Sequence, residues 1–198
     1  MKNKVILTDC DGVLLDWEYA FDQWMRRHDY MPKQPVAAAY KMVDRYDDVC
    51  EKDMNRLIRM FNESAAMRKL PPMGDAIKYV RKLHQDHGYI FHCITSMSTD
   101  TYAQHLRKKN LCEMFGPSVF EDYIFLDCGA DKDEVLEKYR DTGCWWIEDK
   151  PQNADVGLEM GLKSILLEHD YSADYTEKGG QALVMPNWKE IYKEIVSS

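Results

Sequence analysis

The feature that most constrains the fold is a set of short apolar runs separated by segments with helical periodicity. The runs lack strict alternation of apolar and polar residues, which is typical of strands buried on both faces. They are Val5–Thr8, Tyr89–Thr95, Tyr123–Leu126, Cys144–Ile147 and Ser164–Leu167. Apolar residues at helical spacing predict helices near 76–84, 102–106, 135–139 and 156–160. This alternation predicts an α/β fold with a parallel five-stranded core sheet flanked by helices.

The stretch 16–70 departs from this alternation, because it contains no strand candidate. Aromatic and apolar residues recur there at helical spacing in two groups, and core packing is the simplest explanation for most of them. The groups are Trp17, Phe21, Trp24, Met25 and His28, followed by Met54, Leu57, Ile58 and Phe61. A connection this long exceeds an ordinary crossover. We expect residues 16–70 to form a small α-helical cap, inserted into a core made of residues 1–15 and 71–198.

Two acidic residues follow directly on the first predicted strand. Ligands of open α/β sheets bind at the carboxyl ends of the strands, so Asp9 and Asp11 are expected to project into that crevice. Gly12 allows the chain to turn sharply after them. Two carboxylates in this position can divide the work of a nucleophile and an acid–base group, although an Asp-x-Asp-Gly turn also occurs in ordinary loops and calcium loops.

Polar residues also end the second and fourth predicted strands. Thr95 and Ser96 offer hydroxyl and backbone N–H groups that can hold a phosphate, unless this segment serves only to cap the next helix near Ser98. Glu148 and Asp149 add two carboxylates. Beside the first acidic pair they would form the oxygen-rich site that Mg²⁺ prefers, whereas on their own they are equally typical of a solvated turn.

A lysine stands at the predicted start of the helix after the third strand. The helix dipole disfavours a cation there. Lys132 is therefore either an exposed residue of the first turn, with Asp131 and Glu134 as the cap, or a residue turned toward the crevice. In the second position its charge would offset the nearby carboxylates and a bound phosphoryl group.

These four sites, in this order and each after a predicted strand, resemble the motifs of the haloacid dehalogenase-like (HAD) superfamily of hydrolases. The matching segments are Asp9-Cys10-Asp11-Gly12-Val13, Thr95, Lys132 and Glu148-Asp149, and Leu70-Pro71-Pro72-Met73-Gly74 looks like the return from a small helical cap. The resemblance implies a Rossmann-like core. Within the superfamily, segments 9–17 and 147–153 look most like the 5′(3′)-deoxyribonucleotidases.

Two positions depart from the pattern of the superfamily. Asn153 stands where many relatives have a further acidic residue, which places more weight on Glu148 in the metal shell. Lys132 is followed by Asp133 instead of the common proline.

The resemblance implies a two-step phosphoryl transfer. Asp9 would attack phosphorus, and Asp11 would act as general acid and then as general base. Mg²⁺ would be held by Asp9, the main-chain carbonyl of Asp11 and Asp149, with Glu148 bound directly or through water. The phosphate oxygens would be bound by Thr95, the N–H of Ser96 and Lys132. Asp11 argues against dehalogenation, because a halide leaves without a proton.

The expected function is therefore a Mg²⁺-dependent phosphomonoester hydrolase, acting on a nucleoside monophosphate. A sugar-phosphate phosphatase or phosphomutase is the alternative enzyme, and a non-catalytic HAD-like binding protein is the alternative from another class. The cap would choose the substrate, and its candidate contacts are Trp17, Tyr40, Arg45 and Tyr46. A small cap favours a small phosphorylated metabolite.

Charge and cysteine spacing limit the partners and the compartment. The 198 residues carry a formal charge of −8, which argues against a protein that coats long nucleic acids or an anionic membrane. Six cysteines without a CxxC pair indicate reduced thiols in a cytoplasmic protein. The apolar runs are far shorter than a membrane helix or the core of a signal peptide requires. The sequence sets no oligomeric state.

Overall fold

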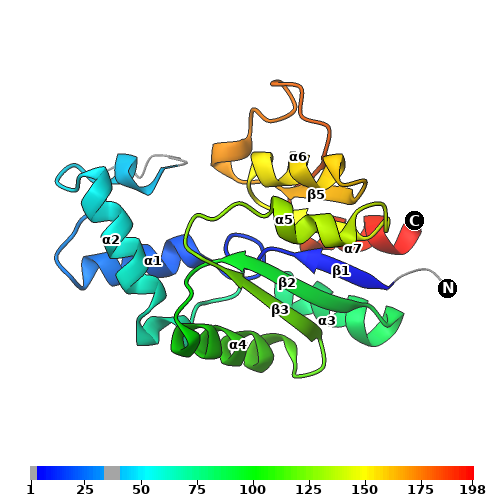
Figure 1. Cartoon of the computed structure of the whole chain (residues 1–198), viewed down its shortest axis with the longest axis horizontal. Coiled ribbons are helices and arrows are strands. Elements are labelled where there is room, and N and C mark those ends of the chain that lie inside the picture. Colours follow the sequence, from blue (N-terminus) through cyan, green and yellow to red (C-terminus); the bar gives the residue numbers. More distant parts are fainter. Residues whose placement is uncertain (1–3, 34–40) are drawn as a thin grey trace.

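The computed structural model describes residues 4–33 and 41–198, and a six-stranded sheet in the order β3-β2-β1-β4-β5-β6 forms its centre (Figure 1). The strands are β1 (Val5–Thr8), β2 (Ile90–Ser96), β3 (Phe120–Leu126), β4 (Trp145–Glu148), β5 (Lys163–Leu167) and β6 (Leu183–Met185). Every neighbouring pair is parallel. The prediction of a Rossmann-like α/β fold with a parallel sheet is confirmed.

The sheet has one strand more than the five predicted. β6 contains only three residues at the edge of the sheet, next to β5, and Leu183 is 44% exposed. The residues of β6 belong to the short apolar run 182–185, which the predicted strands did not include. The five predicted runs overlap the other strands, although β3 begins earlier, at Phe120, because its exposed residues Glu121 and Asp122 hide the start of the strand.

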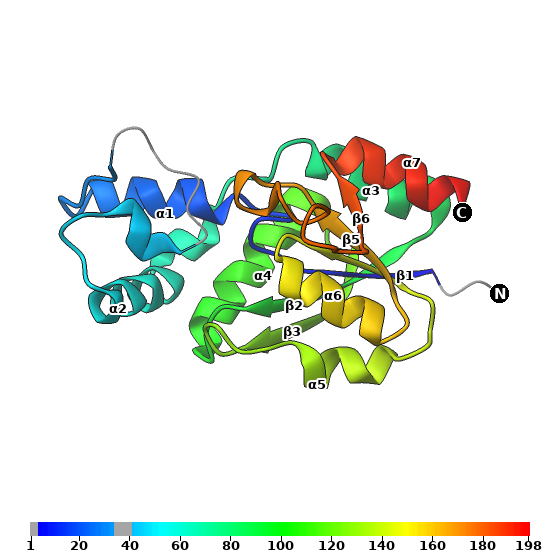
Figure 2. The ribbon, with the colours of Figure 1, turned by 90° about the horizontal axis from the view of Figure 1, so that it is seen from above.

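Helices surround the sheet on both faces and at one end (Figure 2). Within the described residues, the α-helices are α1 (Trp17–Arg26), α2 (Glu51–Asn62), α3 (Ala76–His87), α4 (Thr101–Phe115), α5 (Asp133–Leu136), α6 (Pro151–Glu159) and α7 (Trp188–Ser197). Short 3₁₀ helices are η1 (Met42–Arg45), η2 (Ala65–Arg68), η3 (Glu137–Tyr139) and η4 (Asp170–Ser172). Helix α7, which the sequence patterns did not predict, packs beside α3, where Tyr79 and Tyr192 lie 5.5 Å apart between ring centroids.

The helical segment between β1 and α3 lies beyond the carboxyl ends of the strands, as Figures 1 and 2 both show for α1 and α2. Its first and last residues run side by side: the N–H of Asp16 donates to the carbonyl of Pro71 at 2.9 Å, and the N–H of Met73 donates to the carbonyl of Leu14 at 2.8 Å. The side chain of Asp16 then caps α1 by accepting a hydrogen bond from the N–H of Tyr19. The backbone therefore enters and leaves the segment through two adjacent, hydrogen-bonded stretches of chain.

A continuous apolar cluster joins the sheet to the helical segment. Buried Phe21 and Phe61 of the helical segment belong to the same cluster as Ile6 and Phe91 of the sheet. The rings of Phe21 and Phe61 meet edge to face at 5.4 Å. This shared packing holds α1 and α2 over the ends of the strands. Among the described helices none is long and apolar enough to cross a membrane.

Candidate active site

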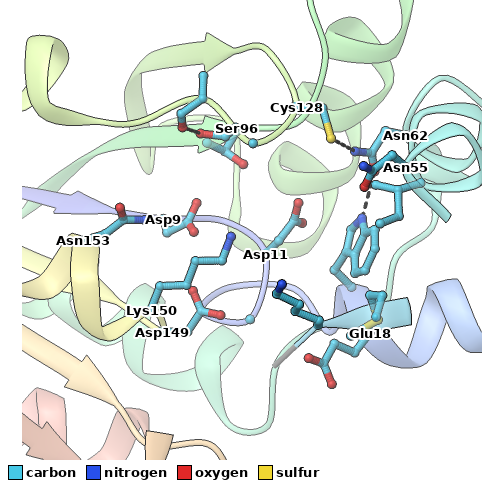
Figure 3. Close-up of a pocket in the computed structure, with 18 of the residues that line it drawn as sticks. Asp9, Asp11, Glu18, Asn55, Asn62, Ser96, Cys128, Asp149, Lys150 and Asn153 are labelled. Carbon is cyan, nitrogen blue, oxygen red and sulfur yellow. Dashed lines mark hydrogen bonds between the residues drawn. The ribbon is translucent and has the colours of Figure 1, made fainter. Parts of the chain in front are cut away.

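A cavity of about 1230 Å³ lies between the carboxyl ends of the strands and the helical segment. The loops after β1, β2, β3 and β4 line one side, and α1 and α2 line the other. Of the residues predicted for the site, those that line it are Asp9, Asp11, Trp17, Thr95, Ser96, Lys132 and Asp149. Figure 3 shows side chains from both sides of the cavity facing the same space.

Asp9 is held rigidly at the end of β1. Its N–H donates to the carbonyl of Ile147 in β4 at 2.9 Å, which extends the β1–β4 pairing by one residue. Its carboxylate accepts from the N–H of Cys10 at 2.7 Å and lies 2.8 Å from Nζ of Lys132. Burial raises the pKa of Asp9 from 3.8 to about 6, because it outweighs the opposing charge of Lys132.

The turn after Asp9 requires glycine at position 12. Gly12 has a φ of +77°, and a Cβ atom there would lie 2.4 Å from Oδ2 of Asp149. The absent side chain thus lets the loops after β1 and β4 touch. On its other side, the carbonyl of Gly12 is hydrogen-bonded to Nε2 of His169 at 2.8 Å.

Lys132 is turned inward and is not an exposed residue of the first turn. Its side chain is 2% exposed, and Nζ lies 2.8 Å from Oδ2 of Asp9 and 2.7 Å from Oε2 of Glu148. These two buried carboxylates raise the pKa of Lys132 despite the opposing effect of burial, so the ammonium stays charged.

Glu148 is fully buried, and hydrogen bonds occupy both of its oxygens. Oε1 accepts from the N–H groups of Asp149 and Lys150, at 3.0 and 3.1 Å. Oε2 accepts from Lys132 and from Nδ2 of Asn153, at 2.7 and 3.2 Å. Glu148 therefore holds Lys132 in place, and Asn153, which stands where a further acid could be, donates a hydrogen bond to the Glu148 carboxylate.

Asp149 has a carboxylate oxygen that is available for a cation. Oδ2 accepts a hydrogen bond from the hydroxyl of Tyr171, whereas the buried Oδ1 has no hydrogen-bond partner within residues 4–33 and 41–198. Carboxylate oxygens of Asp9, Glu148 and Asp149 lie within 4.8 Å of one another. Because hard oxygen ligands and an unsatisfied carboxylate suit a small divalent cation, these residues fit Mg²⁺.

Thr95 and Ser96 end β2 at the edge of the cavity. Thr95 is 1% exposed, and its Oγ1 has no hydrogen-bond partner within the part of the chain that the structure describes. Ser96 donates its hydroxyl to the carbonyl of Ala130 at 2.8 Å, which ties β2 to the loop that carries Lys132 (Figure 3). Asp100 caps α4, so the Thr95 hydroxyl is not used in capping.

Asp11 is paired with an arginine that the sequence patterns did not single out. Nη1 of Arg107, which comes from α4, donates to Oδ1 of Asp11. Burial raises the pKa of Asp11, and the guanidinium acts in the opposite direction. No pattern could have found Arg107, because its helix meets Asp11 only through the packing of α4 below the β1 loop.

The helical segment places its four predicted substrate contacts in different ways. Trp17 lines the cavity, but its ring stacks on Phe21 at 4.8 Å and its Nε1 donates to Oδ1 of Asn62 at 2.8 Å, so it also belongs to the packed core of the segment. Arg45 and Tyr46, whose orientation the sequence left open, are buried and do not line the cavity. Tyr40 lies outside the described residues.

The buried position of Arg45 and Tyr46 has a clear electrostatic reason. Arg45 pairs with Oδ2 of Asp22 at 2.7 Å and with Oε2 of Glu18 at 2.9 Å, while the hydroxyl of Tyr46 donates to Oδ1 of Asp22 at 2.7 Å. A buried guanidinium must be paired, and both of its partners lie on α1. Of this group, Glu18 lines the cavity.

Two further residues near the acidic cluster follow β5. Tyr171 donates to Asp149, and its ring stacks on His169 with centroids 5.0 Å apart. Because both come just after a predicted strand end, the rule that ligands bind at the carboxyl ends of strands could have identified them.

Comparison with known proteins identifies the fold. No protein-family model matches the chain. An uncharacterized 32.4 kDa protein of Enterobacteria phage T4, from the gp30–rIII intergenic region, is 25% identical over 165 residues; the match covers 78% of this chain and 57% of the relative's length. The chain thus spans little more than half of that relative.

Solved structures match over nearly the whole chain. A haloacid dehalogenase-like hydrolase from Streptococcus pneumoniae has a TM-score of 0.65 at 13% identity, covering 98% of this chain and 99% of that one. A D,D-heptose 1,7-bisphosphate phosphatase from B. bronchiseptica, solved with magnesium and phosphate, has a TM-score of 0.59 at 12% identity, and the match covers 98% of each chain. An L-2-haloacid dehalogenase from Xanthobacter autotrophicus has a TM-score of 0.60 at 11% identity, and the match again covers 98% of each chain. The chain has the HAD-like fold, which serves phosphatases and dehalogenases alike.

Proposed function

We propose that this protein is a Mg²⁺-dependent phosphomonoester hydrolase that carries the phosphoryl group on Asp9. The observation that carries the proposal is the surroundings of Asp9. A charged lysine lies on one side, the unpartnered Thr95 hydroxyl lines the same cavity, and the unsatisfied Oδ1 of Asp149 is close by. Positive charge, a free donor and a metal-fitting oxygen suit a dianionic phosphate beside a nucleophile.

In the first step, a carboxylate oxygen of Asp9 attacks phosphorus, and the bond from phosphorus to the leaving-group oxygen breaks. Asp11 donates its proton to that oxygen, so the alcohol leaves neutral. In the second step, water attacks the phosphorus of the aspartyl-phosphate and gives its proton to Asp11. The bond between phosphorus and Asp9 breaks, and inorganic phosphate leaves. Burial raises the pKa of Asp11 and so favours the protonated form, whereas the Arg107 guanidinium opposes this shift.

Asp9 and Asp149, with the main-chain carbonyl of Asp11, would hold the Mg²⁺. The ion would neutralise charge on the nucleophile and on a phosphate oxygen. Glu148 has its oxygens occupied by Lys132, Asn153 and two backbone N–H groups, so we assign it mainly to holding Lys132. Thr95 and Lys132, together with the N–H of Ser96, would bind the phosphate oxygens.

Asp11 distinguishes phosphate transfer from the other reactions of this fold. A dehalogenase has no leaving group to protonate, and a binding protein needs no acid–base group beside a nucleophile. We therefore favour a phosphatase over a dehalogenase and over a non-catalytic binding protein.

We assign the helical segment, residues 16–70, to a cap that selects the leaving group. The cavity of about 1230 Å³ has room for a nucleoside monophosphate, our first candidate, and amide side chains such as Asn55 line its cap side. A sugar phosphate is the second candidate, since one structural neighbour is a heptose bisphosphate phosphatase. All six cysteines are free thiols, which fits a cytoplasmic enzyme that acts on small phosphorylated metabolites.

The test is phosphate release from nucleoside monophosphates, sugar phosphates and phosphoglycolate, with Mg²⁺ or with EDTA. Wild type is expected to release phosphate only with Mg²⁺, most rapidly from a nucleotide. Asp9→Asn is expected to lose on the order of 10³-fold or more in kcat while remaining folded. Asp174→Asn, which changes a carboxylate in an exposed ion pair, is the control. Faster release from sugar phosphates would change the assigned substrate but leave the mechanism as proposed. Equal rates for Asp9→Asn and wild type would refute the mechanism.

A further inference from the structure

Arg107 is a fully buried charge to which the proposed reaction steps give no role. It lies in the first half of α4, its side chain is 0% exposed, and it is among the largest fully buried side chains within the described residues. Buried guanidinium groups are costly unless they are paired. Its position therefore calls for an explanation beyond packing.

The guanidinium of Arg107 is compensated by one carboxylate. Nη1 donates to Oδ1 of Asp11 and to Sγ of Cys10, the latter at 3.0 Å, while Nη2 points to Sδ of Met67 at 3.1 Å. Nε has no hydrogen-bond partner among residues 4–33 and 41–198. Thioether and thiol sulfur atoms are weak acceptors. Within the described residues Asp11 is thus the only anion paired with this cation.

The ion pair restrains Asp11 in one orientation. Oδ1 faces Arg107, and the other oxygen, Oδ2, accepts no hydrogen bond from the described residues, although Asp11 lines the cavity. Figure 3 shows the Asp11 carboxylate between Asp9 and the side chains of α2 in that view. Rotation of Asp11 would leave the buried guanidinium without its counter-charge. One oxygen is therefore anchored while the carboxylate stays at the cavity wall.

Arg107 does not itself reach the substrate space. It does not line the cavity, unlike Lys132 and Lys150, and its fork is closed off by Cys10 and Met67. Direct binding of phosphate is therefore not its role, and any effect on the reaction must pass through Asp11.

We propose that Arg107 is a positioning residue that fixes the Asp11 carboxylate for proton transfer to the leaving-group oxygen. This inference rests on the proposed function. An arginine suits this role, since the N–H groups of its planar guanidinium have fixed directions: Nη1 donates to Asp11 while Nη2 is directed to Met67. The Met67 contact comes from η2, at the end of the helical segment, so the same side chain links the cap to the acid–base group.

The leaving group supplies the test. p-Nitrophenolate is a stable anion that leaves without a proton, whereas an aliphatic alkoxide needs one. The value of kcat/KM covers the steps up to formation of the aspartyl-phosphate. Arg107→Met is expected to lower kcat/KM at least about 10-fold for the best aliphatic phosphate ester, and less than about 3-fold for p-nitrophenyl phosphate. Arg107→Lys keeps the charge but not the planar guanidinium. It is expected to lower kcat/KM more for the aliphatic ester than for p-nitrophenyl phosphate, and by less than Arg107→Met does.

Arg68→Met is the matched control, because Arg68 joins η2 to Glu113 of α4 at the protein surface. Arg68→Met is expected to leave kcat/KM unchanged for both esters. The double variant Arg107→Met/Asp11→Asn leaves no buried charge unpaired at this place, so it avoids the destabilisation that an unpaired buried charge causes. It is expected to match Asp11→Asn on both esters.

The outcomes separate this inference from the proposed function. Equal losses on both esters for Arg107→Met and Arg107→Lys would overturn it while wild type remained an active phosphatase. A further loss of more than about 3-fold when Arg107→Met is added to Asp11→Asn would also overturn it. Absence of metal-dependent phosphate release by wild type would instead refute the proposed function.

Discussion

Asp9 shows how burial and charge compete at a single residue. It is 5% exposed, and its pKa rises from 3.8 to about 6 although Lys132 is adjacent. The folded protein thus binds this proton more tightly than the unfolded chain does. The stability that the protonated form provides is fully present below pH 3.8 and is lost as the pH rises through about 6.

The metal-free protein should therefore be destabilised by Asp9 as the pH rises. The difference of about two units between the pKa of Asp9 in the folded and in the unfolded state corresponds to about 3 kcal/mol in the free energy of unfolding. Asp9→Asn, which does not ionise, should gain about this much over wild type between pH 4 and pH 7, as measured by urea unfolding in EDTA. Asp174→Asn should instead run parallel to wild type. A constant difference between Asp9→Asn and wild type across this range would contradict the assigned pKa.

At the scale of elements, α2 joins the core through two neighbouring residues of different burial. Asn62 is 3% exposed, accepts from Nε1 of Trp17 at 2.8 Å and donates to the carbonyl of Met97 at 3.0 Å. Arg59, one turn earlier, reaches Asp127 at 3.1 Å, and both side chains are about half exposed. A buried hydrogen bond and a solvated ion pair thus link the same helix to neighbouring loops.

These two links should differ in their contribution to stability. Asn62→Ala leaves a partly buried indole N–H and a buried carbonyl without partners and should cost about 1–3 kcal/mol in the free energy of unfolding. Arg59→Ala should cost less than Asn62→Ala, because water and salt screen its ion pair. Denaturant unfolding of both variants makes the comparison. A larger loss for Arg59→Ala would show that the exposed pair, and not the buried amide, holds α2 in place.

At the scale of the whole molecule, the formal charge is −8, and Asp9, Glu148 and Asp149 bring three carboxylates together. Binding of a cation at this cluster is therefore expected to stabilise the folded state. A ligand that binds only the folded state stabilises it, by about 2.7 kcal/mol at 100 times its Kd. For a chain of this size that corresponds to roughly 5–10 °C in Tm.

Mg²⁺ should accordingly raise the Tm of wild type, and Asp149→Asn should lose most of this increase because the negative charge of the carboxylate that would hold the ion is removed. Scanning calorimetry in EDTA and in Mg²⁺ measures the effect. NaCl at the same ionic strength is the control, since it screens surface charge without occupying a site. Equal increases with Mg²⁺ and NaCl would refute a specific metal site.

Local sequence determined the strands and the strand-end residues. A run such as Val5–Thr8 is apolar because both faces of a central parallel strand are covered, and the loop that follows it must lie at the ligand-binding edge of the sheet. Asp9, Thr95 and Asp149 could be chosen for that reason. β6 and α7 were not predicted, although β6 lies in a short apolar run and the buried residues of α7, Trp188, Ile191 and Ile195, recur at helical spacing.

Only the tertiary structure decided which charges meet. Lys132 could be interpreted as exposed or inward until Glu148 and Asp9 were found on either side of it. Arg45 and Arg107 are both buried, yet one pairs behind the cavity and the other beneath Asp11. Periodicity reports which face of an element is apolar, because that property is local. The partner of a buried charge depends on residues distant in the chain, so it is settled only when the elements pack.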